Sequence, residues 1–290
     1  MTEPQALPPA RPSGAAKSAE GSSGLEARTH GDRPRGRTAG ARWRPLTTQL
    51  GPHTTQLGPL TAELRGEGPT VVLLHGNGED ARVFDQVVPY LDGMRVIALE
   101  ARGHGRTPEG QAPLTIPRLA KDVEQALTAA EAKGLADGKA VIVGFSDGAN
   151  VAMELAIHRP ALVRALVLIG GNYRPAGVRL GARIVIVAAW VGLSAAGLVS
   201  KAARRRARIW GLMVGQPRIA EADLAQIEAP TLVMAGQRDL ISRRHTDRLA
   251  TLVRGARRVI VQGYGHMLPT EAPDRLGPIM ARFLGSLREI

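Results

Sequence analysis

A serine between two glycines is the residue in this chain whose position most clearly suggests chemistry. The run Gly144-Phe145-Ser146-Asp147-Gly148 follows a short β-branched stretch and precedes a helix-like segment. This G-x-S-x-G pattern is typical of a nucleophile held at a tight turn between a strand and a helix, where its oxygen projects clear of the sheet. The glycines leave room where a Cβ would crowd the turn. Ser146 is therefore the candidate nucleophile, and an ordinary helix N-cap is the alternative role for it.

A base and an orienting acid are available further along the chain. A serine hydroxyl is a weak nucleophile at neutral pH and needs a base, which in turn needs a group to orient it. Asp239 and His266 each follow a predicted strand, at 231–235 and 258–261. Catalytic groups of open α/β sheets gather at the carboxyl ends of the strands, so we expect these two side chains to meet Ser146 there.

The elements that would position these residues alternate regularly from Leu60 onward. Strands are expected at 70–74, 95–99, 140–143, 165–169, 231–235 and 258–261, and helices at 81–91, 116–133, 147–158, 242–253 and 272–287. The strands are nearly all apolar and the segments between them are amphipathic. This pattern favours an α/β fold with a mostly parallel sheet and helices on both faces.

The alternation is interrupted at about 172–227, which we interpret as an inserted helical cap. Within it, Ile184 to Ser200 runs for seventeen residues without a charge, the lower edge of a membrane-spanning length. A single crossing would separate Ser146 from Asp239 and His266, so a cap that lines an apolar pocket is the better interpretation. Arginines follow the run at 204–206 and 208. Weak peripheral contact of the cap with a membrane is therefore a further expectation.

The first part of the chain has a different composition. Residues 1–45 are rich in Pro, Gly, Ser, Ala and Arg, and such a segment cannot bury enough apolar surface to order itself. We expect a disordered extension there, without the apolar core of a signal peptide, and a folded domain at 46–290. A short repeat, T-T-Q-L-G-P, occurs at 47–52 and again at 54–59. Two copies indicate a local duplication rather than a repeat fold.

Composition excludes several classes of function. The 290 residues include no cysteine, and the seven histidines form no H-x-x-x-H pair, so disulfides, thiolate chemistry and a metal site are not expected. The formal net charge is +12, but no nucleic-acid motif or basic–aromatic pattern accompanies it. We expect a cytoplasmic protein with no nucleic-acid partner, no cofactor and no metal.

Taken together, the motifs resemble a known family. Beside Ser146, Asp239 and Gly265-His266, the chain has His75-Gly76-Asn77-Gly78 after one strand and Arg102-Gly103-His104-Gly105-Arg106 after the next. From about Leu60 to Ile290 it resembles the α/β-hydrolase superfamily, of the lid-bearing serine esterase type. The resemblance implies the α/β-hydrolase fold with a helical cap inserted after the sixth strand. The family often has Asp before Ala101, where this chain has Glu100.

The resemblance also implies roles for particular residues. Ser146 would be the nucleophile, His266 the general acid and base, and Asp239 the carboxylate that orients it. The backbone N–H groups of Asn77 and Asp147 would form the oxyanion hole. His75, which precedes Gly76, and His104, within the 102–106 segment, are expected to be structural rather than catalytic.

The expected activity is hydrolysis of a carboxylic ester, or a thioester or lactone, of a small apolar substrate through an acyl-enzyme. One alternative is a binding protein that keeps the hydrolase fold without activity. A second is dinucleotide binding, because Gly76-Asn77-Gly78 lies between a strand and a predicted helix and Glu100 ends the following strand. That second alternative leaves Ser146, Asp239 and His266 without a role.

Overall fold

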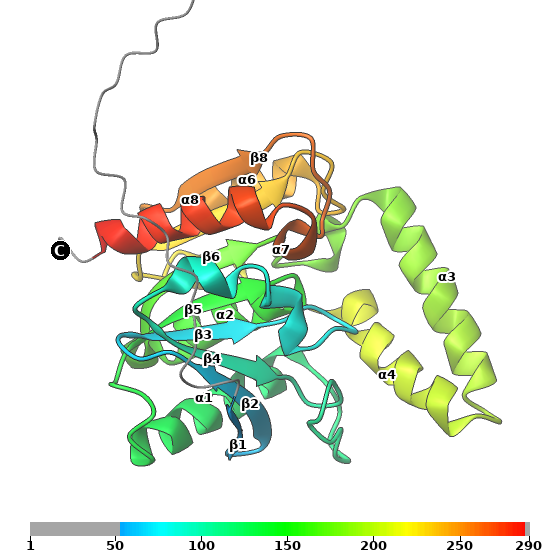
Figure 1. Ribbon diagram of the computed structural model, residues 1–290. Helices are drawn as coiled ribbons and strands as arrows, with labels where there is room; N and C mark the ends of the chain where they lie inside the picture. Colours follow the sequence, from blue (N-terminus) through cyan, green and yellow to red (C-terminus); the bar gives the residue numbers. More distant parts are fainter. Residues whose placement is uncertain (1–52, 288–290) are drawn as a thin grey trace, which may run out of the picture. The chain divides into compact units, whose positions relative to one another are not determined.

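The computed structural model describes residues 53–287. The predicted disordered extension at 1–45 and the first copy of the repeat at 47–52 lie outside the described residues. Within the described part, eight strands form one sheet in the order β1-β2-β4-β3-β5-β6-β7-β8, seen in Figure 1 from β1 and β2 at the bottom to β8 at the top. The strands are β1 (His53–Leu57), β2 (Leu60–Arg65), β3 (Thr70–Leu74), β4 (Arg95–Glu100), β5 (Ala140–Phe145), β6 (Val163–Ile169), β7 (Thr231–Gly236) and β8 (Arg257–Val261).

The sheet is parallel from β4 through β8, and only the β1–β2 and β2–β4 pairs are antiparallel. Successive side chains of a strand point to opposite faces, and this divides the apolar strands between two cores. In β5, Ile142 belongs to one core, whereas Val141 and Val143 belong to the other. The prediction of a mostly parallel sheet with helices on both faces is confirmed.

Helices cover both faces of the sheet. They are η1 (Ala81–Phe84), η2 (Val88–Leu91), α1 (Ile116–Ala132), α2 (Asp147–His158), η3 (Pro160–Leu162), η4 (Pro175–Gly177), α3 (Leu180–Ala196), α4 (Lys201–Gly215), α5 (Glu221–Leu224), α6 (Arg243–Leu252), α7 (Leu268–Glu271) and α8 (Pro273–Ser286). The core on one face includes residues of α1, α2 and α6, and the core on the other face includes residues of η1, η2, α7 and α8.

One local prediction was wrong. The helix expected at 81–91 is a pair of short 3-10 helices, η1 and η2. Pro89 lacks an N–H and disfavours an α-helical conformation at the residue before it, which disfavours one continuous α-helix here. The second copy of the repeat, at 54–59, supplies most of edge strand β1, which turns back into β2 through Gly58 at a φ of 54°. No strand was expected there.

The segment predicted as a cap contains α3 and α4, which form a helical hairpin between β6 and β7. We call residues Leu180–Gly215 the α3–α4 hairpin. Figure 1 shows it beyond the carboxyl ends of the parallel strands, with its turn pointing away from the sheet. No helix among residues 53–287 is both long and apolar enough to cross a membrane.

Candidate active site

Ser146 occupies the turn between β5 and α2. Its backbone has a φ of 53° and a ψ of −119°, the one positive φ among the non-glycine residues at 53–287. Such a conformation is strained and persists only where the surroundings enforce it. A Cβ at Gly148 would collide with the carbonyl of Leu74, and one at Gly144 would collide with the carbonyl of Gly148. The two glycines are thus required by close packing of the turn, which presents the serine side chain at the strand ends.

His266 lies within hydrogen-bond distance of this serine. It follows β8, and its Nε2 is 3.0 Å from Ser146 Oγ although the two residues are 120 positions apart. The ring also rests against Phe145, with the ring centroids 5.1 Å apart. Its other nitrogen, Nδ1, is 2.7 Å from Asp239 Oδ1. The orientation of the ring is therefore set from both sides.

Asp239 completes the line of side chains from the loop after β7. Its carboxylate is 1% exposed and accepts hydrogen bonds from the N–H of Ile241 at 2.9 Å and of Gly236 at 3.3 Å. These bonds fix the orientation of the carboxylate toward the imidazole. The structure thus brings the three residues that the sequence nominated into one continuous path from carboxylate to hydroxyl.

The two residues nominated for the oxyanion hole lie on either side of the serine. The loop that carries Asn77 passes so near that a Cβ on Gly76 would lie 3.1 Å from the Cβ of Ser146. Asp147 is the first residue of α2, so its N–H is one of the helix donors that have no intrahelical acceptor. Both residues line the same cavity as Ser146.

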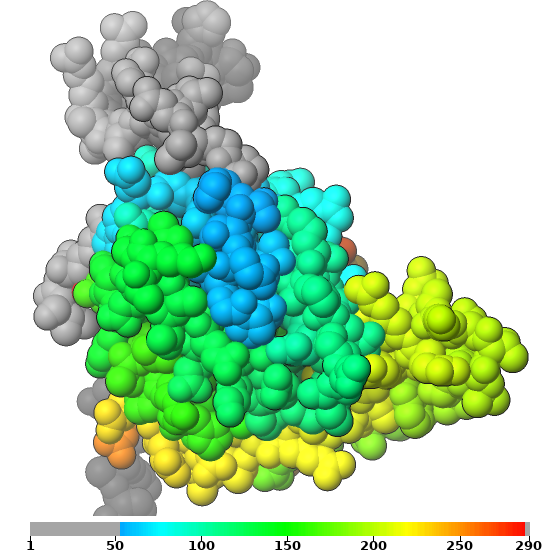
Figure 2. Space-filling model, turned by 90° about the horizontal axis from the view of Figure 1, so that it is seen from below, coloured from blue at the N-terminus to red at the C-terminus, as the bar shows by residue number. Residues whose placement is uncertain are grey.

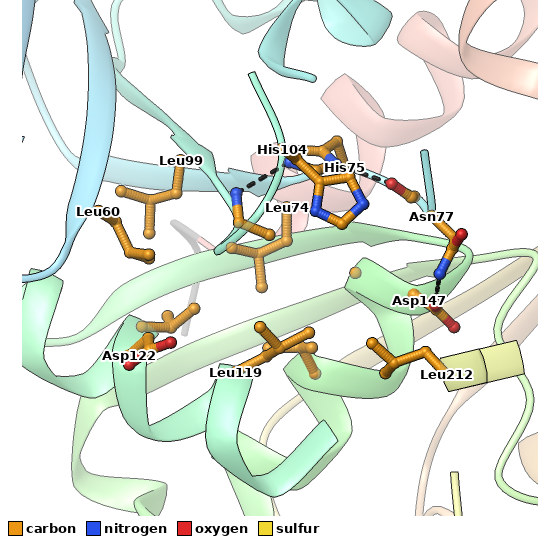
Figure 3. A pocket seen from close by; sticks show the side chains of 15 residues that line it. Leu60, Leu74, His75, Asn77, Leu99, His104, Leu119, Asp122, Asp147 and Leu212 are labelled. Carbon is orange, nitrogen blue, oxygen red and sulfur yellow. Dashed lines mark hydrogen bonds between the residues drawn. The ribbon is translucent and has the colours of Figure 1, made fainter. Parts of the chain in front are cut away.

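The side chains of these two residues also bond to each other, which sequence reasoning missed. Asn77 Nδ2 donates to Asp147 Oδ2 at 2.9 Å and to the carbonyl of Ile209 in α4 at 2.9 Å, and Figure 3 shows its amide directed at Asp147. Asn150 donates to the other oxygen, Oδ1, at 3.1 Å. Burial raises the pKa of Asp147, and the hydrogen bond from Asn77 opposes that shift. The carboxyl therefore links the loop after β3 to the start of α2.

Two histidines connect the loop after β3 to the loop after β4. His75 Nε2 accepts from the N–H of Ala101 at 2.9 Å, and His104 Nε2 accepts from the N–H of Gly78 at 3.0 Å. Burial lowers the pKa of both rings, in His75 to about 4. Neutral imidazoles are what these bonds need, because a protonated Nε2 cannot accept. The two side chains hold the loops after β3 and β4 together.

Two cavities flank this loop, and only one opens on the serine. One cavity, of about 30 Å³, is lined by Leu74, His75 and His104 among the side chains drawn in Figure 3, and it has room for about one water molecule. The other, of about 180 Å³, is lined by Ser146 and His266 together with apolar side chains. Those apolar side chains are Phe145, Val178, Ile186, Met213, Leu240, Ile241 and Met267.

The wall of the larger cavity also contains a carboxyl group, that of Glu79. Burial raises the pKa of Glu79 above its ordinary value. Its Oε2 is buried and, among the residues the structure describes, has no hydrogen-bond partner; the same holds for Asn77 Oδ1. The cavity therefore combines a mainly apolar wall with two unpaired acceptors.

The region around Gly76-Asn77-Gly78 does not favour a dinucleotide. Pyrophosphate binding uses the N-terminus of a following helix, but the next element is the one-turn 3-10 helix η1. The acidic residue for a ribose, Glu100, is buried and its carboxylate accepts bonds from the Arg106 guanidinium at 2.9 to 3.2 Å. Glu100 thus stabilises the 101–106 loop.

Comparison with known proteins is consistent with this geometry. A family profile described as the alpha/beta hydrolase family matches residues 71–277. Lipase LipV of Mycobacterium tuberculosis is 40% identical over 103 residues, which are 35% of this chain and 37% of LipV. The (E)-2-((N-methylformamido)methylene)succinate hydrolase of Acinetobacter baylyi is 24% identical over 249 residues, covering 76% of this chain and 92% of that protein. The match thus spans little more than a third of LipV.

The fold also matches solved structures. A hydrolase from Pseudomonas aeruginosa superimposes with a TM-score of 0.64 and 26% sequence identity. The match covers 78% of this chain and 94% of that chain. The shared part therefore includes almost all of the related molecule.

Proposed function

This chain belongs to the alpha/beta hydrolase family, and we propose that it hydrolyses a carboxylic ester, or a thioester or lactone, of a small apolar substrate. The supporting observation is the path from Asp239 through His266 to Ser146, with separations of 2.7 and 3.0 Å. The path ends at a cavity of about 180 Å³. A nucleophile, a base and an orienting acid in this order are the parts that acyl transfer needs.

In the first half of the proposed reaction, Ser146 Oγ attacks the substrate carbonyl carbon while His266 Nε2 accepts its proton. The electron pair of the carbonyl moves onto oxygen, and the N–H groups of Asn77 and Asp147 stabilise that oxyanion. The Asp239 carboxylate stabilises the imidazolium at Nδ1. The C–O or C–S bond to the leaving group then breaks, and His266 returns the proton to the leaving oxygen or sulfur.

In the second half, water attacks the acyl-enzyme carbonyl and His266 accepts a proton from it. The oxyanion forms again, the bond from the acyl carbon to Ser146 Oγ breaks, and the proton returns to that oxygen. The products are a carboxylic acid and an alcohol or thiol. No cofactor takes part in this scheme.

The cavity wall indicates which acyl groups would fit. Phe145, Ile186, Met213 and Met267 offer apolar surface, which favours a hydrocarbon acyl chain. No lysine or arginine is among the described residues that line the cavity, so a second carboxylate on the acyl group would lack a cationic partner there. We therefore do not extend the succinate in the name of the Acinetobacter baylyi relative to this chain.

The proposal is tested by labelling the full chain with a fluorophosphonate probe, which forms a bond with an activated serine. Labelling should occur in the wild type, persist in Ser286→Ala as the matched control, and disappear in Ser146→Ala. A series of p-nitrophenyl esters of increasing acyl length should then define the preferred chain. A folded sample that neither labels nor turns over any ester would favour the alternative of a binding protein without activity.

A further inference from the structure

The α3–α4 hairpin exposes large apolar side chains, whereas those in the rest of the described chain are at least partly buried. Among residues 53–287, the seven exposed large apolar side chains all lie between positions 180 and 199. Leu198 and Val199, at the turn of the hairpin, are 81% and 93% exposed. Helix α3 has no buried residue at all. A contiguous exposed apolar surface of this kind indicates an interaction site.

The exposed residues of α3 form a stripe along one side of the helix. Leu180, Ile184, Val187 and Val191 follow one another at spacings of four, three and four residues, which places them on one helix face. A helix on a protein surface normally turns such a stripe toward the core. Here all four are exposed, and Figure 2 shows the hairpin projecting from the body.

The hairpin is also strongly basic. Its residues, 180–215, contain six arginines and lysines and no aspartate or glutamate. Arg208 pairs with Glu109, and Arg204 and Arg205 donate to backbone carbonyls, which carry no charge to neutralise theirs. Within the described part of the chain, the exposed Lys201 and Arg206 have no ion pair. An apolar stripe beside uncompensated positive charge is typical of helices that lie on anionic lipid.

We propose that the α3–α4 hairpin docks on the surface of a membrane that contains anionic lipid. The apolar stripe of α3 and the turn at Leu198 and Val199 enter the boundary between headgroups and acyl chains, and Lys201 and Arg206 contact the headgroups. Helix α3 is about 25 Å long and lies along the surface. Docking on a second copy of the chain is less favourable, because it would bring two sets of uncompensated arginines together.

The proposed orientation places the helices that form one wall of the cavity between the lipid and Ser146. Ile186 of α3 and Met213 of α4 line the cavity that holds Ser146, and Asn77 is bonded to α4. The outer side of the two helices would meet the membrane while their inner side borders the cavity. The docking proposal itself does not rest on the proposed activity, since it uses no residue of the path from Asp239 to Ser146.

The test is co-sedimentation of the full chain with vesicles of phosphatidylcholine alone or with phosphatidylglycerol. The Ser146→Ala background keeps the experiment independent of catalysis. We expect binding to the anionic vesicles that Leu198→Ser with Val199→Ser weakens at least tenfold. Lys201→Glu with Arg206→Glu should weaken it by a similar factor. Arg164→Glu with Arg254→Glu is the matched control, because it changes the charge equally at exposed positions near the amino ends of β6 and β8, and it should retain more of the binding.

A second measurement reports insertion directly. The chain has no cysteine, so Val199→Cys can carry a single environment-sensitive fluorophore. Its emission should shift to the blue with anionic vesicles, and a label at Arg254→Cys should not shift. Absence of binding, or equal binding by all variants, would overturn the proposal. It would also be overturned by a dimer in sedimentation velocity that Leu198→Ser with Val199→Ser dissociates, because that result assigns the surface to a second copy.

Discussion

At the scale of single residues, the Asp147 side chain connects the loop after β3 to the start of α2. Its carboxyl accepts from Asn77 and Asn150 and so joins the two segments whose N–H groups we assign to the oxyanion. Asp147→Ala should lower kcat about 10- to 100-fold, less than loss of a donor itself, with a small change in KM. Asp147→Asn keeps an acceptor and should remain within about fivefold. Ester kinetics with equal kcat for Asp147→Ala and wild type would show that the loop is held by other contacts.

Substitutions of Ser146 and Asp239 should lower turnover by different factors. Replacing Ser146 by alanine removes the nucleophile and should lower turnover by about 10⁶-fold. Asp239→Asn leaves a neutral partner that favours the wrong tautomer of His266, so turnover should fall about 10⁴-fold. Single-turnover assays with a p-nitrophenyl ester give both values. A loss below about tenfold in Asp239→Asn would assign that carboxylate to folding rather than to the reaction.

At the scale of elements, a buried ion pair ties the loop after β4 to α1. Asp122 of α1 is 1% exposed and receives two bonds from Arg102, at 2.8 and 2.9 Å. Asp122→Asn leaves the partly buried Arg102 guanidinium without its charged partner and should lower the free energy of unfolding by about 2 kcal/mol. Asp247→Asn weakens the exposed pairs with Arg243 and Arg258 and should cost less than about 1 kcal/mol. Urea denaturation of both variants measures the difference, and equal losses would contradict the argument.

How far the sequence predicts an element depends on whether local or distant contacts decide it. The ends of α2 were predicted at Asp147 and His158, because an apolar strand, a glycine turn and a following proline are local signals. Strand β1 was missed because its residues are mostly exposed and polar and it pairs only with β2. A strand at the sheet edge has no buried face to mark it in the sequence.

The site divides in the same way. Order and spacing nominated Ser146, Asp239 and His266 because each follows a predicted strand. The bonds of His75 and His104 to the neighbouring loops join residues 26 positions apart, and no local pattern predicts which loop a side chain will reach. The motifs around these histidines indicated a structural role. Which backbone N–H each ring contacts depends on the sheet order, in which β4 lies beside β3.

At the scale of the whole molecule, buried neutral histidines make stability depend on pH. Burial lowers the pKa of His75 and of His245 from 6.5 to about 4, and it lowers the pKa of His104 as well. Between about pH 4 and pH 6.5, these histidines bind more protons in the unfolded chain than in the folded one. The free energy of unfolding is therefore unaffected by these groups above about pH 6.5 and falls as the pH drops from about 6.5 toward 4.

His75→Gln isolates one share of this dependence, since glutamine can still accept from the N–H of Ala101 but does not titrate. From pH 7.5 to pH 5, wild type should lose about 2 kcal/mol more than His75→Gln, on the order that a pKa lowered from 6.5 to about 4 implies. Urea denaturation of both proteins at the two pH values gives the two losses. The comparison cancels the carboxylates and the other histidines, which both proteins share. Equal losses would mean that the His75 ring is reached by water and protonates in the folded chain, and its bond to the loop after β4 would then be too weak to brace the site.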